Sequence, residues 1–145
     1  MYKHILVPVD GSATAQGAVN RAIELAKAFG CDVSVVYVID PYPFTGLGSD
    51  FAYGQAEYLS AAAAEARQAN DAAVQACKQA GVTASASVVE AHGAWRGILE
   101  AAATSGADLI VMGSHGRHGL EKLVLGSETQ RVLSHSKLSV LVVRE

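Results

Sequence analysis

The spacing of apolar residues along the chain alternates between the pattern of a buried strand and that of a helix with one apolar face. Short apolar or β-branched runs predict strands, and longer stretches with apolar residues on one face predict helices. Strands are predicted at residues 2–10, 31–40, 82–91, 107–113 and 138–143. Helices are predicted at residues 12–30, 56–80, 94–106 and 127–136, with a loop of prolines, glycines and aromatic residues at 41–54. Strand and helix therefore alternate along the whole chain.

This alternation favours right-handed crossovers and a mostly parallel sheet with helices on both faces. In such α/β sheets, ligands bind beyond the carboxyl ends of the strands, near the point where the strand order reverses. The segments PVDGS, DPYPF and GSHGRHG follow the first, second and fourth predicted strands. We therefore expect these three loops to meet at a ligand site.

Length and composition favour one compact domain over residues 1–145. A chain of 145 residues can bury about two-thirds of its unfolded surface, and 50% of its residues are hydrophobic while 17% are charged.

A net charge of −3 without a basic run argues against nucleic acid or an anionic membrane as the main partner. No apolar stretch approaches the roughly 20 residues of a membrane-spanning helix, and the opening MYKHILVPVD is too short for a secretory signal. A cytoplasmic location is expected, with Cys31 and Cys77 as reduced, partly buried thiols.

Glycines at positions 113, 116, 119 and 126 lie between the fourth predicted strand and the fourth predicted helix. A residue without Cβ tolerates positive φ and lets backbone N–H groups approach an anion. The helix that begins at Gly126-Ser127 adds unpaired N–H groups and the positive end of its dipole. These features predict a cradle for two or more phosphates. The alternative is a plain turn followed by a capping box formed by Ser127 and Gln130.

Two widespread nucleotide-binding motifs are absent from the sequence. There is no G-x-x-x-x-G-K-[ST] segment, which excludes the P-loop mechanism, and PVDGSATA lacks the G-x-G-x-x-G of a dinucleotide fold. The predicted phosphate loop instead follows strand four.

The spacing of Gly113, Gly116, Gly126 and Ser127 matches G-x2-G-x9-G-[ST], the signature of the universal stress proteins. PVDGS, VYVID and SVLVVRE also resemble the first loop, second strand and ending of that family. The resemblance covers nearly the whole chain. It implies an open, parallel, five-stranded Rossmann-like sheet of order 3-2-1-4-5 that binds an adenine nucleotide and dimerises through its last strand. Members that keep the glycine signature bind ATP, so the resemblance places this chain in the ATP-binding subgroup.

The resemblance also implies a set of nucleotide-binding residues. Asp10 would face the adenine or ribose edge, Val38 would pack on the base, and Pro8 and Val9 would shape the same wall. The residues expected to line the ribose and phosphates are Met112, Gly113, His115, Gly116 and Arg117. Those expected to close on the polyphosphate are Gly126, Ser127, Glu128 and Thr129.

Some of these positions admit a second interpretation. Asp10 ends a strand before Gly11-Ser12, where a plain turn or helix-cap role is the alternative to nucleotide binding. Glu128 departs from the small or apolar residue usual in the family; a carboxylate facing solvent leaves phosphate binding intact, whereas one facing inward lowers affinity. His115 and His118 in a glycine-rich loop do not suit zinc, so we expect no protein-bound metal, only Mg²⁺ or Mn²⁺ carried by the nucleotide.

The sequence favours a nucleotide-dependent switch over an enzyme. Phosphoryl transfer requires a group that orients the attacking oxygen, and no such base is identified, so little or no ATP hydrolysis and no catalytic residue are expected. Bound ATP would stabilise one state of residues 113–127 and of a lid at 41–55, altering contacts within a homodimer or with an unknown protein partner. An adenylyl-transferring or slow ATP-hydrolysing enzyme is one alternative, although PVDGSATA lacks the histidine of an H-x-G-H-type motif. A nucleotide-free scaffold dimer is another.

Overall fold

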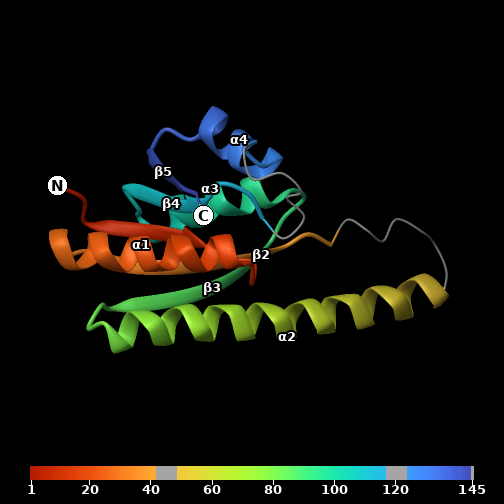
Figure 1. The fold of residues 1–145 in the computed structure, drawn as a ribbon. Helices are drawn as coiled ribbons and strands as arrows, with labels where there is room; N and C mark the ends of the chain where they lie inside the picture. The colour runs from red at the N-terminus through yellow and green to blue at the C-terminus, as the bar shows by residue number, and fades with distance from the viewer. Residues whose placement is uncertain (42–48, 117–123, 145) are drawn as a thin grey trace.

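The computed structural model describes residues 1–41, 49–116 and 124–144, and within these ranges it contains the predicted alternation of strands and helices (Figure 1). The strands are β1 (His4–Pro8), β2 (Asp32–Ile39), β3 (Ala84–Glu90), β4 (Leu109–Gly113) and β5 (Ser139–Val143). The helices are α1 (Ala13–Phe29), α2 (Ser49–Gln79), α3 (Ala94–Ser105) and α4 (Ser127–His135). Apart from the start of α2, the predicted elements are confirmed, with boundaries that differ by one to a few residues.

The strands form one parallel sheet in the order β3-β2-β1-β4-β5, as the family resemblance implies. Ile5 of β1 pairs with Val33 of β2 on one side and with Leu109 of β4 on the other. The chain therefore moves outward from β1 in one direction, returns, and continues from β4 in the other. This reversal beside β1 is where an α/β sheet offers a ligand site.

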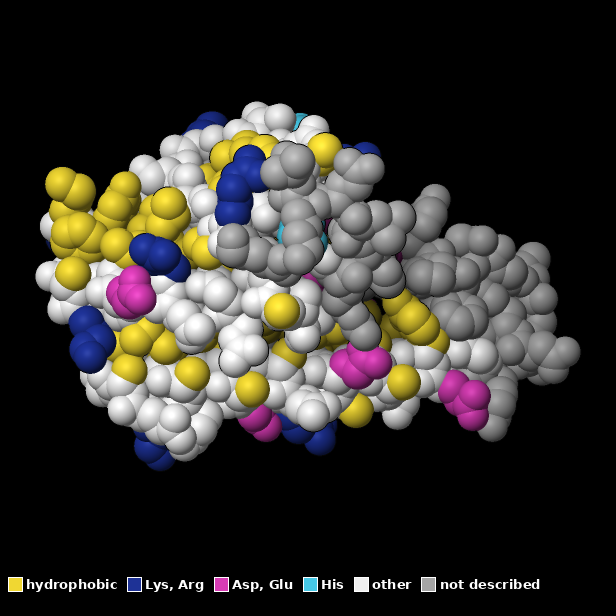
Figure 2. All heavy atoms as spheres, viewed as in Figure 1, with side chains coloured by type: hydrophobic (Ala, Val, Ile, Leu, Met, Phe, Trp, Pro, Cys, Tyr) yellow, Lys and Arg dark blue, Asp and Glu magenta, His cyan; other side chains and the backbone are white. Residues whose placement is uncertain are grey.

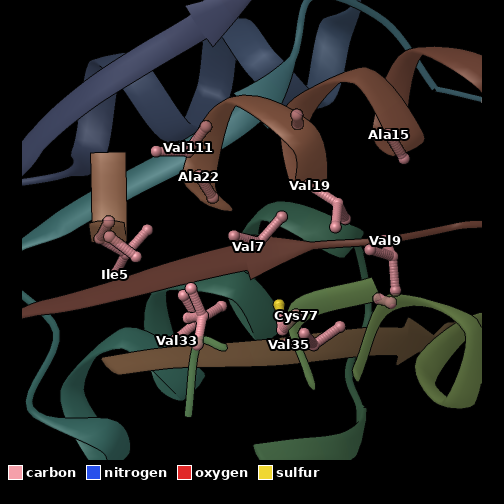
Figure 3. Close-up of a cluster of buried hydrophobic side chains, with 14 of the residues drawn as sticks. Ile5, Val7, Val9, Ala15, Val19, Ala22, Val33, Val35, Cys77 and Val111 are labelled. Atoms are coloured by element: carbon pink, nitrogen blue, oxygen red, sulfur yellow. The ribbon is translucent and has the colours of Figure 1, made fainter. Parts of the chain in front are cut away.

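Helices cover both faces of the sheet, and each face has its own hydrophobic core. On one face, Val7, Val35 and Val111 pack against α1 and α2, including Ala22 and Cys77 (Figure 3). On the other face, Leu6, Val36 and Ile110 pack against α3 and α4. Because successive residues of a strand point to opposite faces, strands buried on both sides read as continuous apolar runs.

Helix α2 begins earlier than the sequence pattern predicted. Residues 49–54, which were expected to belong to a loop, form its first turns, and its N-terminal part extends past the ends of the strands (Figure 1). Gly54 was interpreted as a loop signal, but one glycine lowers helix stability by only about 1 kcal/mol and is tolerated among strong helix formers. The expected lid at 41–55 therefore lies partly in α2, and residues 42–48 lie outside the described residues.

Both cysteines are free and buried, as expected. Burial raises the pKa of the Cys77 thiol. Burial, followed by the negative charge of Asp108, raises the pKa of the Cys31 thiol, which donates a hydrogen bond to the carbonyl of Tyr2 (3.0 Å). Thiols with raised pKa are poor nucleophiles, so both cysteines serve packing.

Within the described ranges, no helix combines the length and the apolar character needed to cross a membrane.

Asp108, just before β4, holds the start of β1 and gives the fold a pH dependence. Its carboxylate accepts hydrogen bonds from the backbone N–H of Lys3 (2.9 Å) and of His4 (3.1 Å). Although desolvation raises the pKa of Asp108, the hydrogen bonds from His4 and Lys3 outweigh it and lower the pKa. A carboxyl group whose pKa is lowered by folding stabilises the native state above its unfolded pKa of about 3.9, and this contribution is lost as pH falls through the folded pKa.

We therefore expect the free energy of unfolding to fall more steeply below about pH 4 in the wild type than in Asp108→Asn. Urea unfolding at a series of pH values measures this difference. Asp32→Asn, which changes a nearby exposed carboxyl at the start of β2, is the matched control. Equal pH profiles for the wild type and Asp108→Asn would contradict the assignment.

Candidate functional site

A cavity of about 490 Å³ lies at the carboxyl ends of β1, β2 and β4, beside the N-termini of α3 and α4. This volume is within the range of small-molecule sites. All the predicted site residues that the structure describes line it, namely Pro8, Val9, Asp10, Val38, Met112, Gly113, His115, Gly116, Gly126, Ser127, Glu128 and Thr129. Arg117, the remaining predicted residue, lies outside the described residues, as do His118, Gly119 and Lys122.

The cavity wall also contains residues that sequence reasoning missed. They are Ala15, Tyr37, Asp40, Tyr58, Ala94 and Ile98. Tyr37 and Asp40 lie close in sequence to the predicted site residue Val38 at the end of β2. Their proximity to this strand end could therefore have indicated that they line the cavity. Tyr58 of α2 and Ile98 of α3 carry no local signal, because only the packing of their helices brings them to the cavity.

Asp10 combines a turn role with a place in the cavity wall. Its Oδ1 accepts a hydrogen bond from the backbone N–H of Ser12 (2.9 Å), across Gly11 with a φ of 83°. Ser12 in turn caps α1, since its hydroxyl accepts from the N–H of Ala15 (3.1 Å). The turn interpretation of Asp10 is thus confirmed, and Asp10 also lines the cavity.

The three signature glycines are needed for close packing. Positive φ is not the reason, because among the described glycines Gly113, Gly116 and Gly126 lack it. A Cβ at Gly113 would lie 2.6 Å from Cγ2 of Thr14, and one at Gly116 would lie 2.8 Å from Oδ2 of Asp10. A Cβ at Gly126 would lie 3.1 Å from Cα of His115. Gly113 and Gly116 therefore let the end of β4 and the residues after it approach the start of α1 and the Asp10 turn, and Gly126 lets the start of α4 approach His115.

Hydrogen bonds fix the residues around these glycines. Nε2 of His115 lies 3.2 Å from Oγ1 of Thr14, and Nδ1 lies 3.2 Å from Oγ of Ser114. The backbone N–H of Gly126 donates to the carbonyl of Ser114 (2.7 Å), and the hydroxyl of Thr129 donates to the carbonyl of Gly113 (3.0 Å). In the described part of the chain, no cluster of three or more His, Cys, Asp or Glu side chains could hold a metal ion.

The N-terminus of α4 is not closed by the capping box that was the alternative explanation of Ser127. Its N-cap is Gly126, which has no side chain, and Ser127 is the first residue of the helix. Nε2 of Gln130 donates instead to the carbonyl of Leu125 (2.7 Å). The start of α4 therefore presents backbone N–H groups and the positive end of a helix dipole at the cavity, where an anion is favoured.

The carboxylate of Glu128 is directed towards the neighbouring helix α3. Its Oε2 accepts a hydrogen bond from the backbone N–H of Trp95 in α3 (2.7 Å), and its Oε1 lies 3.8 Å from Nη1 of Arg131. The carboxylate is thus bound at the N-terminus of the neighbouring helix.

Asp40 and Tyr58 connect three elements of the cavity wall. Oδ2 of Asp40 accepts a hydrogen bond from the N–H of Gly93 (3.1 Å), and the hydroxyl of Tyr58 donates to the carbonyl of Asp40 (3.1 Å). These two bonds join β2 to α3 and α2. The cavity wall combines the apolar side chains of Val38, Ile98 and Met112 with the N–H donors at the start of α4. The cavity therefore suits a ligand that has both an apolar ring and an anionic group.

Comparison with known proteins agrees with this architecture. Residues 1–144 match the model of the universal stress protein family. A universal stress protein of Methanocaldococcus jannaschii is 36% identical over 146 residues, which cover 100% of this chain and 84% of that protein. The universal stress protein UspA of Lactobacillus plantarum superposes with a TM-score of 0.87 at 28% identity, over 99% of this chain and 98% of the other.

A further solved structure is a universal stress protein in complex with cAMP, with a TM-score of 0.68 at 25% identity. The superposition covers 99% of this chain and 97% of that protein. The family model spans nearly the whole sequence, and the sheet order and helix arrangement agree with the family's solved structures. This chain therefore belongs to the universal stress protein family.

Proposed function

We propose that this protein binds an adenine nucleotide, with ATP as the preferred ligand, and acts as a nucleotide-dependent switch in a stress response. One observation carries the proposal: residues predicted from loops far apart in the sequence converge on one cavity, whose wall combines apolar side chains with a helix N-terminus. The cAMP complex of a related universal stress protein supports an adenine-containing ligand. Possession of the glycine signature favours ATP and the ATP-binding subgroup of the family.

In this proposal different parts of the cavity wall bind different parts of the nucleotide. The base packs against Val38, with Pro8, Val9 and Asp10 along the adenine or ribose edge. The ribose and phosphates lie against Met112, Gly113, His115 and Gly116 and reach the start of α4 at Gly126, Ser127 and Thr129, with Arg117 as a source of positive charge. Mg²⁺ or Mn²⁺ enters with the phosphates, because oxygen ligands from a nucleotide suit both ions.

We further propose little or no ATP hydrolysis and no catalytic residue. Phosphoryl transfer needs a group that orients the attacking oxygen. The three carboxylates in the cavity wall already accept hydrogen bonds from backbone N–H groups: Asp10 from Ser12, Asp40 from Gly93 and Glu128 from Trp95. An adenylyl-transferring or slow ATP-hydrolysing enzyme remains the alternative activity.

The sheet edge at β5 supports a homodimer. Leu141 on this strand and Leu133 on the adjoining α4 are 37% and 42% exposed, and an edge strand has unpaired backbone groups.

On the face seen in Figure 2, Lys and Arg side chains lie singly among acidic ones, unlike the basic stripe of a nucleic-acid-binding surface. Buried free thiols suit a reducing compartment, which supports a cytoplasmic location.

We expect the purified protein to bind ATP in the presence of Mg²⁺, and to release intact ATP rather than AMP and pyrophosphate. Calorimetric titration with ATP, ADP and AMP, with and without Mg²⁺, measures affinity and preference. Chromatography of nucleotides released by denaturation identifies what co-purifies. Light scattering with and without ATP measures the molar mass and hence the oligomeric state.

The outcomes separate the alternatives. Steady formation of ADP, or of AMP and pyrophosphate with an added acceptor, would establish one of the enzyme alternatives. A dimer that binds none of the nucleotides under any of these conditions would establish the scaffold.

A further inference from the structure

The start of α3 lacks a cap from its own sequence. Its N-cap is Gly93, whose φ of 90° suits glycine and which offers no side chain, and its first turn contains no acidic residue. The first N–H groups of a helix need acceptors, and a carboxylate is favoured there by the helix dipole. Two carboxylates from other elements fill this role: Asp40 accepts from the N–H of Gly93 (3.1 Å) and Glu128 from that of Trp95 (2.7 Å).

Trp95 also contacts the far end of α4. Its ring stacks on the imidazole of His135 with centroids 4.4 Å apart, and its backbone N–H is held by Glu128. Glu128 and His135 lie at opposite ends of α4, so a single residue of α3 is fastened at both ends of that helix. The stack and the Glu128 bond together fix the distance between α3 and α4.

Both helices line the cavity. α3 contributes Ala94 and Ile98, on either side of Trp95 in sequence, and α4 contributes Ser127 and Thr129, on either side of Glu128. A change in the spacing of α3 and α4 therefore moves the apolar wall relative to the helix N-terminus that the phosphates would approach.

We propose that Glu128 is a positioning residue that clamps α3 to α4 and thereby sets the width of the nucleotide cavity. This inference rests on the proposed function. Because the clamp sets the position of the α3 wall of the cavity, its loss displaces the side chains that contact the nucleoside. Binding of the nucleoside part of the ligand is therefore weakened. A charge effect on phosphates would instead depend on how many phosphates the ligand has.

The test compares ATP, AMP and adenosine, each with Mg²⁺, by calorimetric titration of four proteins: the wild type, Glu128→Ala, Glu128→Gln and Arg131→Ala. Glu128→Ala is expected to weaken all three ligands by the same factor, about ten-fold, since it leaves the Trp95 N–H without its charged acceptor. Glu128→Gln is expected to remain within about three-fold of the wild type, because its amide oxygen can still accept that hydrogen bond. Arg131→Ala is the matched control, since it removes only an exposed partner of Glu128.

Two results would overturn the clamp. One is wild-type affinity of Glu128→Ala for all three ligands. The other is tighter ATP binding by both Glu128 variants with adenosine unchanged, which would mean that the carboxylate acts by repelling phosphate.

A second readout needs no ligand. Trp95 is the only tryptophan, so the emission comes from this residue alone and reports on the surroundings of its ring, which include His135 and Arg96. Glu128→Ala should change the emission maximum and increase quenching by acrylamide, whereas Arg131→Ala and Glu128→Gln should resemble the wild type. If the wild type binds none of the three ligands, the proposed function fails, and unchanged Trp95 emission in Glu128→Ala would independently refute the clamp.

Discussion

Gly113→Val is expected to abolish nucleotide binding, with a loss of affinity for ATP of at least about 100-fold, equivalent to about 2.7 kcal/mol. The added side chain would collide with Thr14, because its Cβ alone would lie 2.6 Å from Cγ2 and 3.2 Å from the backbone carbonyl carbon of that residue. Thr14 is buried in the first turn of α1 and also contacts His115. The collision therefore disturbs two neighbours of Thr14 that line the cavity, Ala15 and His115. Overpacking of this kind lowers the free energy of unfolding by about 1–3 kcal/mol.

Calorimetric titration with ATP and Mg²⁺ measures the loss, and far-UV circular dichroism checks that helix content is kept. Gly126→Ala is a milder second variant, since its Cβ would meet the backbone of His115 at 3.1 Å outside the main cores. Gly17→Ala is the matched control. Its Cβ would have only a side-chain contact with Val143 at 3.9 Å, so ATP binding should persist while helix propensity raises stability by up to about 1 kcal/mol. Wild-type affinity for ATP in both Gly113→Val and Gly126→Ala would show that the glycine loop does not take part in nucleotide binding.

The order of elements was predictable because burial on both faces leaves a strong local signal. Runs such as Leu109–Gly113 are apolar without alternation, whereas α1 shows one apolar face between a serine cap and a left-handed glycine. The position of the cavity followed from the same order, since loops after parallel strands meet at one edge. The strand order came from the family resemblance, as local patterns do not specify which strands pair.

Other features depend on contacts between distant segments and have no local pattern. Glu128 was correctly identified at the start of α4, but its bond to Trp95 joins residues 33 positions apart. The sequence likewise explains the signature glycines only in part. It is compatible with two reasons for glycine, close approach of the backbone and positive φ. In the structure, close contacts with Thr14, Asp10 and His115 leave no room for a Cβ, and φ is not positive.

Gly97 shows most clearly what sequence reasoning could not find. In the sequence it is an ordinary glycine inside a predicted helix, where it lowers helix propensity. In the structure it is buried in α3 directly over Val38 of β2, and a Cβ would lie 2.7 Å from both methyl groups of that valine. Val38 lines the cavity, so this contact sets how closely α3 approaches the proposed base-binding wall.

We expect Gly97→Ala and Val38→Ala each to lower the free energy of unfolding, and the double variant to lose much less than the sum. Gly97→Ala should destabilise by about 1–3 kcal/mol, despite its better helix propensity, because the Val38 methyl groups block the new Cβ. Val38→Ala removes both methyl groups and should destabilise by about 1–2 kcal/mol. In the double variant the new methyl at position 97 occupies the vacated space, which predicts a favourable coupling of about 1–2 kcal/mol.

Urea unfolding of the four proteins in the cycle measures this coupling, and ATP titration shows whether the double variant regains affinity lost in Gly97→Ala. Val111→Ala supplies the control cycle, because Val111 belongs to the core on the opposite face of the sheet and should combine with Gly97→Ala additively within about 0.5 kcal/mol. Additive effects of Gly97→Ala and Val38→Ala would mean that the two residues do not compete for the same space. Recovery of both stability and ATP affinity in the double variant would instead show that the Gly97–Val38 contact shapes the wall against which the base is proposed to pack.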